Sequence, residues 1–144
     1  MEELVTYLGP GTAADARREL AACNAAGSRF GLILTPRELE ELAEARQQAL
    51  TATERVEFGG GILPKLAAAF CGSPYLNAED YAATLAELQE AFYYFKNESR
   101  DALSDDELLR RMAELYDGPA GGSMDYLCST ALPALCRRLR EKRL

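Results

Sequence analysis

The sequence predicts an all-α protein, folded as a single domain of five to six helices joined by short connections. Three observations support this prediction. Apolar residues recur at every third or fourth position through most of the 144 residues. Side chains that commonly cap helix N-termini precede several of these stretches, as at Thr35, Asn77 and Ser104. Glycines and prolines fall between the stretches, and we therefore assign residues 1–144 to one helical domain.

The first two helices are expected over residues 13–25 and 36–52. The start of the second is strongly marked, because Thr35 is followed at once by proline and three residues later by a glutamate that completes a capping box. Arg46 falls on the inward face of this helix. Since a buried charge must be paired, we expect Arg46 to contact a carboxylate.

Two short segments, residues 30–34 and 55–58, lie on either side of the helix that begins after Thr35. We expect both to be extended connectors. The alternative is a two-stranded ribbon between them. Such a ribbon would be minor, because two pieces of this length can form at most a marginal sheet. A short apolar helix is predicted next, over residues 62–71, with Gly72 ending it.

The longest predicted helix covers residues 78–98, with Asn77 as its N-cap. Its apolar residues are spaced alternately by four and three positions, which is typical of a helix at the centre of a core. These residues are Tyr81, Leu85, Leu88, Phe92 and Phe95.

Two further helices complete the prediction. A capping box at Ser104, with three acids in the first turn, begins a helix that ends at an Asp-Gly pair. Ser123 is expected to cap the last helix, over residues 124–142. Because Pro133 lies inside that helix, we expect a kink or break near residues 130–132.

Composition limits the chemistry that the chain can perform. It has no histidine, and its four cysteines contain no C-x-x-C pair, so we expect no metal and no cofactor. The missing histidine also makes an enzyme less expected than a binding protein. No apolar run approaches the length of a membrane span, and the N-terminus lacks the pattern of a secretory signal. We therefore expect a cytoplasmic protein with buried, free cysteines.

One candidate ligand site is the glycine-rich segment RVEFGGGILPKL, residues 55–66. Backbone N–H groups of a glycine turn that leads into a helix can bind an anion. The candidate residues of this site are Arg55, Glu57, Gly59, Gly60, Gly61 and Lys65. The segment matches neither the phosphate-binding P-loop nor the dinucleotide pattern. The favoured interpretation is that the glycines let the chain turn a tight corner.

A second candidate is a protein interface around FYYF, residues 92–95. Tyr93 and Tyr94 fall partly outside the core stripe. Packing in the core and in a second layer is the favoured interpretation, and an interface is the alternative, because tyrosine is common in protein interfaces. The last eight residues carry a charge of +4 in a chain whose net charge is −7. Such a tail suits the C-terminal end of a helix or the acidic surface of a second copy, whereas nucleic acid would need a wider basic surface.

The stretches RVEFGGGILPKL and FYYFKNESRDALSDDEL resemble a bacterial family described as a domain of unknown function. The resemblance extends from about Phe30 to Leu132. It implies a small cytoplasmic bacterial protein and brings no activity, cofactor or catalytic residue. The residues that carry the likeness are Glu57, Phe58, Gly59, Gly60, Gly61, Lys96, Asn97 and Glu98.

Two functions remain open at this point. The first is a non-catalytic helical interaction or scaffold protein that binds another protein or forms a homo-oligomer such as a dimer. The second is a protein that binds a small anionic ligand at the Gly59–Gly61 turn, with or without catalysis. Neither function involves nucleic acid or a membrane.

Overall fold

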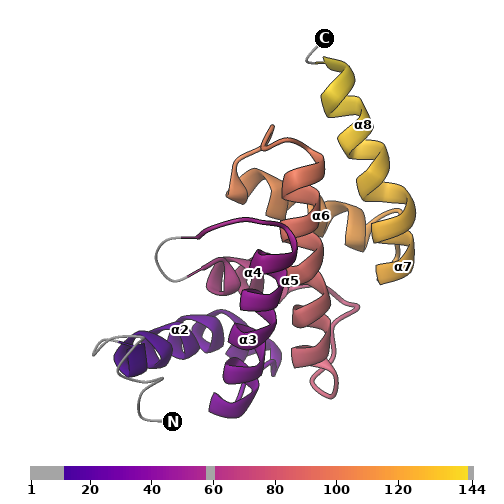
Figure 1. Ribbon diagram of the computed structural model, residues 1–144. Helices are drawn as coiled ribbons and strands as arrows, with labels where there is room; N and C mark the ends of the chain where they lie inside the picture. The colour runs from indigo at the N-terminus through magenta and orange to yellow at the C-terminus, as the bar shows by residue number, and fades with distance from the viewer. Residues whose placement is uncertain (1–11, 58–60, 143–144) are drawn as a thin grey trace.

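The computed structural model describes residues 12–57 and 61–142, and these residues fold into helices without strands. Figure 1 shows the helices in chain order. Their bounds are α2 Thr12–Gly27, a 3₁₀ turn Ser28–Phe30, α3 Pro36–Ala52, α4 Leu63–Phe70, α5 Tyr81–Glu98, α6 Asp105–Asp117, α7 Met124–Tyr126, a π turn Leu127–Ala131, and α8 Leu132–Lys142. With α7, the π turn and α8 taken as one, the described chain has six helices, and the predicted all-α class is confirmed.

The start of α3 follows the prediction in detail. The Thr35 hydroxyl accepts a hydrogen bond from the Glu38 amide at 3.0 Å, and the Glu38 carboxylate accepts one from the Thr35 amide at 2.9 Å. Both N–H groups would otherwise lack a partner at the helix end. The predicted capping box of α6 forms only in part. The Ser104 hydroxyl accepts from the Glu107 amide at 3.2 Å, whereas the Glu107 carboxylate lies 3.5 Å from that hydroxyl instead of bonding the Ser104 amide.

Helix α5 begins at Tyr81, three residues later than predicted. The Asn77 side chain does not cap it but accepts a hydrogen bond from the Asp80 amide at 3.1 Å, which holds residues 77–80 in a turn of their own. Asp80 is the N-cap instead. The predicted core stripe of α5 is confirmed, because all five of its apolar residues are buried.

Pro133 has the expected effect on the last helix, in a specific form. A proline cannot donate the backbone hydrogen bond that an α-helix needs at its position. The chain responds with the π turn over residues 127–131, in which the Leu132 amide donates to the carbonyl of Leu127, five residues earlier. Beyond this turn α8 continues and projects past the neighbouring helices (Figure 1).

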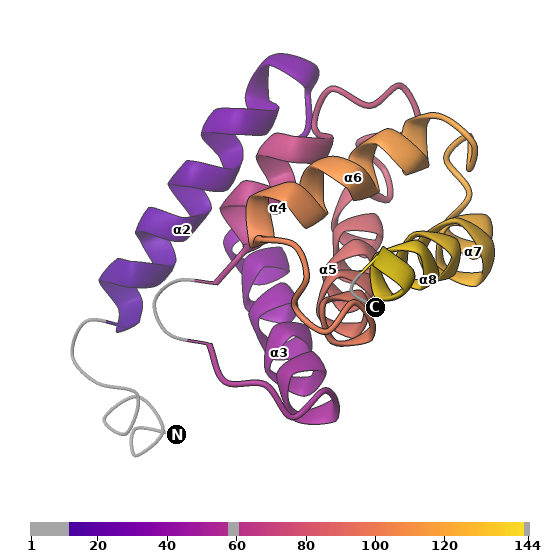
Figure 2. The same ribbon diagram turned by 90° about the horizontal axis from the view of Figure 1, so that it is seen from above.

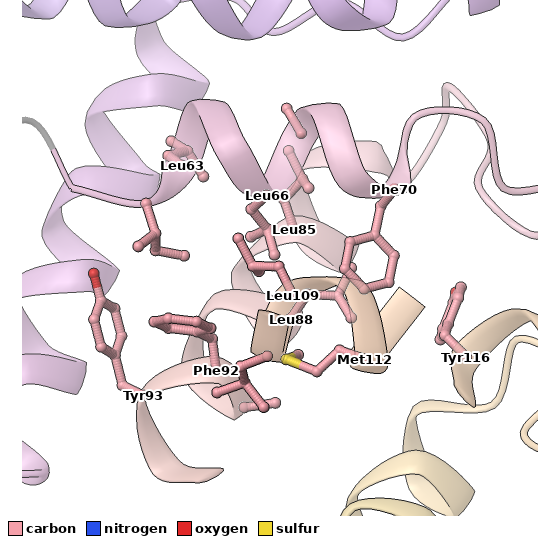
Figure 3. Packing of buried hydrophobic residues seen from close by; sticks show 14 of the residues in the cluster. Leu63, Leu66, Phe70, Leu85, Leu88, Phe92, Tyr93, Leu109, Met112 and Tyr116 are labelled. Atoms are coloured by element: carbon pink, nitrogen blue, oxygen red, sulfur yellow. The ribbon is translucent and has the colours of Figure 1, made fainter. Parts of the chain in front are cut away.

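Helix α5 lies at the centre and packs against α3, α4, α6 and α8. Figure 2 shows the short helix α4 held between α2 on one side and α6 on the other. Leucines and aromatic residues from α4, α5 and α6 meet in the core (Figure 3). Among the largest side chains that are fully buried there are Phe70, Leu85, Phe92 and Met112.

The alternative ribbon does not form between the described parts of the two segments. The expectation of an extended connector over 30–34 was too long, because Phe30 ends the 3₁₀ turn and Gly31 has a left-handed backbone with a φ of +74°, which leaves residues 32–34 as the connector. The Asn24 amide side chain bonds both backbone groups of Leu34, donating to its carbonyl at 3.0 Å and accepting from its N–H at 2.8 Å. A side chain thereby supplies the two bonds that a neighbouring strand would supply. Residues 55–57 are also without strand structure, and Phe58 lies outside the described residues.

The four cysteines are free, with Cys23 and Cys136 buried and Cys71 and Cys128 half-buried. None of the helices in the described part of the chain is both long and apolar enough to cross a membrane.

Candidate functional site

Arg55, the first residue of the predicted ligand site, joins the end of α3 to the end of α5. Its guanidinium donates to the side-chain oxygen Oδ1 of Asn97 at 2.6 Å and to the Asp101 carboxylate at 2.9 Å. The Asn97 amide donates in turn to the Thr53 backbone carbonyl at 2.7 Å. Arg55 lowers the pKa of the Asp101 carboxyl, mainly by hydrogen bonding to its charged form. The arginine is therefore engaged in holding two helix ends together.

Glu57 is bound by a tyrosine of α5. Its carboxylate accepts a hydrogen bond from the Tyr93 hydroxyl at 2.6 Å. Burial, followed by this hydrogen bond, raises the pKa of Tyr93 far above its usual range, so the hydroxyl stays protonated and remains a donor. In Figure 3 the Tyr93 hydroxyl points away from Phe92 at the edge of the core cluster. Glu57 thus fixes the segment that follows α3 onto α5.

Gly61 is the one residue of the glycine triplet within the described part of the chain, since Gly59 and Gly60 lie outside it. Its backbone has a φ of +82°, which glycine adopts easily. A Cβ atom at this position would lie 2.8 Å from a guanidinium nitrogen of Arg46. Both the left-handed backbone and the close approach require glycine here, in agreement with the favoured interpretation of a tight corner.

Arg46 itself is paired as expected. Its guanidinium donates to the Glu19 carboxylate of α2 at 2.7 Å, with the two side chains only 18% and 11% exposed. Each charge compensates the other, so neither is left without a partner away from water. The prediction that Arg46 meets a carboxylate is therefore confirmed, and this ion pair lies directly beneath Gly61.

Lys65 lies in a different environment. Its ammonium pairs with the exposed Asp106 carboxylate at 3.2 Å, across from α4 to the start of α6. Both residues line an open groove of about 490 Å³ between these helices, with Ala68, Ala69 and Ala113 among the apolar lining residues. Arg55, Glu57 and Lys65 thus each contact a different partner, and the structure joins them in no shared ion pair or hydrogen bond.

The two predicted interface tyrosines differ in exposure. Tyr93 is 1% exposed, so the prediction that it lies partly outside the core is wrong. Its ring is held by Phe92, in an edge-on contact, and its hydroxyl by Glu57. Tyr94 is 52% exposed and remains available to a partner. Successive residues on a helix point about 100° apart, so the neighbouring elements cover Tyr93 and leave much of Tyr94 exposed.

Tyr94 borders a groove between α5 and α8. The groove holds about 200 Å³ and is lined by Tyr94, Phe95, Glu98, Cys128, Pro133, Cys136, Arg137 and Arg140. Arg140 donates to the backbone carbonyl of Glu98 at 2.9 Å, and this bond fixes the outer part of α8 onto the end of α5. The positive charge of the C-terminal tail had already singled out the basic residues of this groove, Arg137 and Arg140.

The sequence did not identify Pro133 and Cys128 as residues of this groove, because only the packing of α8 on α5 brings them beside Tyr94. Burial, and then the carboxylates of Glu87, Glu90 and Asp125, raise the pKa of the Cys128 thiol. A thiol in such surroundings is a poor nucleophile at neutral pH, because little of it is ionised.

Among the described residues, no group of three or more His, Cys, Asp or Glu side chains is placed to hold a metal ion. Comparison with curated proteins and with solved structures gave no match. A family model, described as a family of unknown function (DUF6323), matches residues 19–144, which is most of the chain. The chain therefore belongs to this family of unknown function.

Proposed function

We propose that this protein is a non-catalytic interaction module that self-associates through the groove between α5 and α8. The observation that carries the proposal is the half-exposed aromatic ring of Tyr94 at the edge of that groove. Tyrosine gives an interface a large apolar contact and a polar end, at a small cost in side-chain entropy. Arg137 and Arg140 line the same groove, and arginine is likewise enriched where proteins meet.

The absence of a reactive group near the groove also favours binding over catalysis. The groove holds two thiols, Cys128 and Cys136, and burial is the largest cause of the raised pKa of both. A nucleophilic cysteine needs the opposite shift. The cytoplasm is the compartment that we assign to the protein, since its cysteines are free.

Sedimentation equilibrium or multi-angle light scattering at micromolar concentrations tests the proposal. Wild type should have twice the mass of one chain, and Tyr94→Ala should shift it towards the monomer. Ile33→Ala is a matched control, because Ile33 is 51% exposed but lies on the connector before α3. A wild type that stays monomeric throughout would refute self-association. If Tyr94→Ala and Ile33→Ala shifted the mass equally, the groove would not be the surface of self-association.

The alternative function, an anionic-ligand site at the glycine turn, has weaker support. Arg46 does bring a cation against Gly61, but Glu19 already balances its charge. Thermal-shift measurements with inorganic phosphate would revive this alternative if phosphate raised the melting temperature of wild type and not that of Lys65→Ala.

A further inference from the structure

We propose that the face formed by α5, α7 and α8 docks onto the same face of a second copy, in an antiparallel arrangement about a two-fold axis. This inference rests on the proposed self-association and names its surface and geometry. It follows from the order of charges along the face. One end is acidic, the other is basic, and Tyr94 lies between them.

The acidic end consists of Glu87 and Glu90 on α5 and Asp125 on α7, and all three side chains are exposed. Glu90 and Glu87 lie one and two helical turns before Tyr94, on the same stripe of α5. Asp125 lies three residues before Cys128, which lines the groove together with Tyr94. Their influence on the same thiol agrees with this grouping, since all three carboxylates raise the pKa of Cys128.

The basic end is formed by the outer turns of α8. Arg137 and Arg140 line the groove, and Arg138 and Lys142 extend the positive charge towards the end of the helix. The acids at this end are fewer, namely Glu98 on α5 and Glu141 on α8. Figure 1 shows this part of α8 projecting beyond the other helices, where a second molecule can reach it.

Both sides of the groove run in the same direction from the acidic to the basic end. Near the middle, the Cys136 thiol lies 3.9 Å from the Phe95 carbonyl, and further along Arg140 bonds the Glu98 carbonyl. From Glu87 to Glu98 the face is about 16 Å long, at 1.5 Å per residue. This exceeds the Debye length of about 8 Å at physiological ionic strength, so solvent ions largely screen the two ends from each other.

A second copy is the occupant that fits this polarity. When two such faces meet antiparallel, the acidic end of each lies against the basic end of the other, and Tyr94 and Pro133 meet near the axis. A parallel arrangement would bring like charges together. The antiparallel face is therefore self-complementary, as a two-fold interface requires, with an apolar centre and a charged rim.

Charge reversal followed by mixing tests this geometry. In the acid-end variant, Glu87→Lys and Glu90→Lys outweigh Asp125, so both ends of the face carry a net positive charge. In the base-end variant, Arg137→Glu and Arg140→Glu give both ends a net negative charge, although Arg138 and Lys142 remain. Each variant alone should dissociate at least about tenfold more readily than wild type, because like charges meet at both ends of its dimer. An equimolar mixture should restore the dimer as a heterodimer, and added salt should weaken it.

Further variants serve as controls. Arg137→Glu alone leaves the bond from Arg140 to α5 intact and should give a smaller effect of the same sign, which keeps the test valid if the double variant unfolds. Glu40→Lys with Glu44→Lys makes the same charge change on the exposed face of α3 and should leave the dimer unchanged. Circular dichroism checks the fold of each chain.

The outcomes separate the two proposals. A monomeric wild type would overturn both. A dimeric wild type whose charge-reversed variants remain fully dimeric would overturn the antiparallel face and leave self-association standing. Variants that dissociate alone without recovering in the mixture would also overturn the antiparallel arrangement, because in that arrangement each positive end of one variant would lie against a negative end of the other.

Discussion

Replacing Gly61 by alanine should destabilise the protein strongly, through two separable effects. The first is the backbone, whose φ of +82° costs a residue with a side chain about 1–2 kcal/mol. The second is crowding, because the new Cβ would lie 2.8 Å from a nitrogen and 3.0 Å from the Cδ of Arg46. The guanidinium must then shift, although its bond to Glu19 holds it in place.

The size of the effect follows from these contacts. The Arg46–Glu19 pair is largely buried, and breaking a buried pair outright costs about 3–5 kcal/mol. A guanidinium that is displaced without breaking the pair loses only part of this energy. Alanine also lowers the conformational entropy of the unfolded chain, which favours the folded state by about 0.4–1 kcal/mol. We expect a net loss of about 2–4 kcal/mol, or a fall in melting temperature of roughly 6–15 °C.

Gly31 provides a matched control for the backbone effect. Its φ is +74°, yet nothing lies within 4 Å of a Cβ built there. Gly31→Ala should therefore cost only about 1 kcal/mol, the strain less the gain from the unfolded chain. Urea denaturation followed by circular dichroism gives the free energy of unfolding of both variants.

A double-mutant cycle isolates the crowding. In a background carrying Glu19→Gln and Arg46→Met, no charge is left buried without a partner, and the methionine can move aside. There Gly61→Ala should cost no more than Gly31→Ala. Equal costs in the wild-type and substituted backgrounds would refute the argument, as would a Gly61→Ala variant as stable as wild type.

Three further predictions concern single side chains. Tyr93→Phe removes the hydroxyl that donates to Glu57 and should lower the free energy of unfolding by about 1–2 kcal/mol in urea denaturation. The pKa of Asp101 lies below its ordinary 3.8, first because Arg55 bonds its carboxylate, so its contribution to stability is present above that pH and lost as the pH falls through the lowered pKa. The stability difference between wild type and Asp101→Asn should therefore vanish in acid. Burial raises the pKa of Cys23 to about 12, so at about pH 8 this thiol should react with a disulfide reagent no faster than the chain unfolds.

Each of these predictions can fail in a defined way. Tyr94→Phe, which alters an exposed tyrosine, should have almost no effect, and a loss equal to that of Tyr93→Phe would contradict the role given to Glu57. Asn and Asp both tolerate the positive φ of residue 101, so the substitution leaves the backbone unstrained, and a stability difference that persists in acid would contradict the role given to the charge of Asp101. Fast labelling of Cys23 in the folded chain would show that α2 opens locally.

The sequence was most informative where neighbours in the chain decide the structure. The cap at Thr35, the core stripe of α5 and the disturbance before Pro133 all depend on residues within one or two turns of each other. The corner at Gly61 was expected for the same reason, because backbone freedom is a local property.

Contacts between distant segments could not be predicted in the same way. The pattern places Tyr93 partly outside the core stripe, since nothing in FYYF reveals that Glu57, 36 residues away, binds its hydroxyl. Periodicity predicted that Arg46 faces inward and needs a carboxylate, but many glutamates could have served, and packing selected Glu19. For the same reason the sequence could not reveal that Lys65, one of the candidate residues of the glycine-turn site, contacts Asp106.

The π turn over residues 127–131 determines which side of α8 faces α5. A π turn holds one residue more than the α-helical turn it replaces, and one residue corresponds to about 100° of rotation around a helix axis. The single surplus residue therefore determines which side of α8 contains Arg137 and Arg140. A related chain with one residue fewer in this turn would keep nearly the same sequence in α8 but direct a different set of its side chains towards α5.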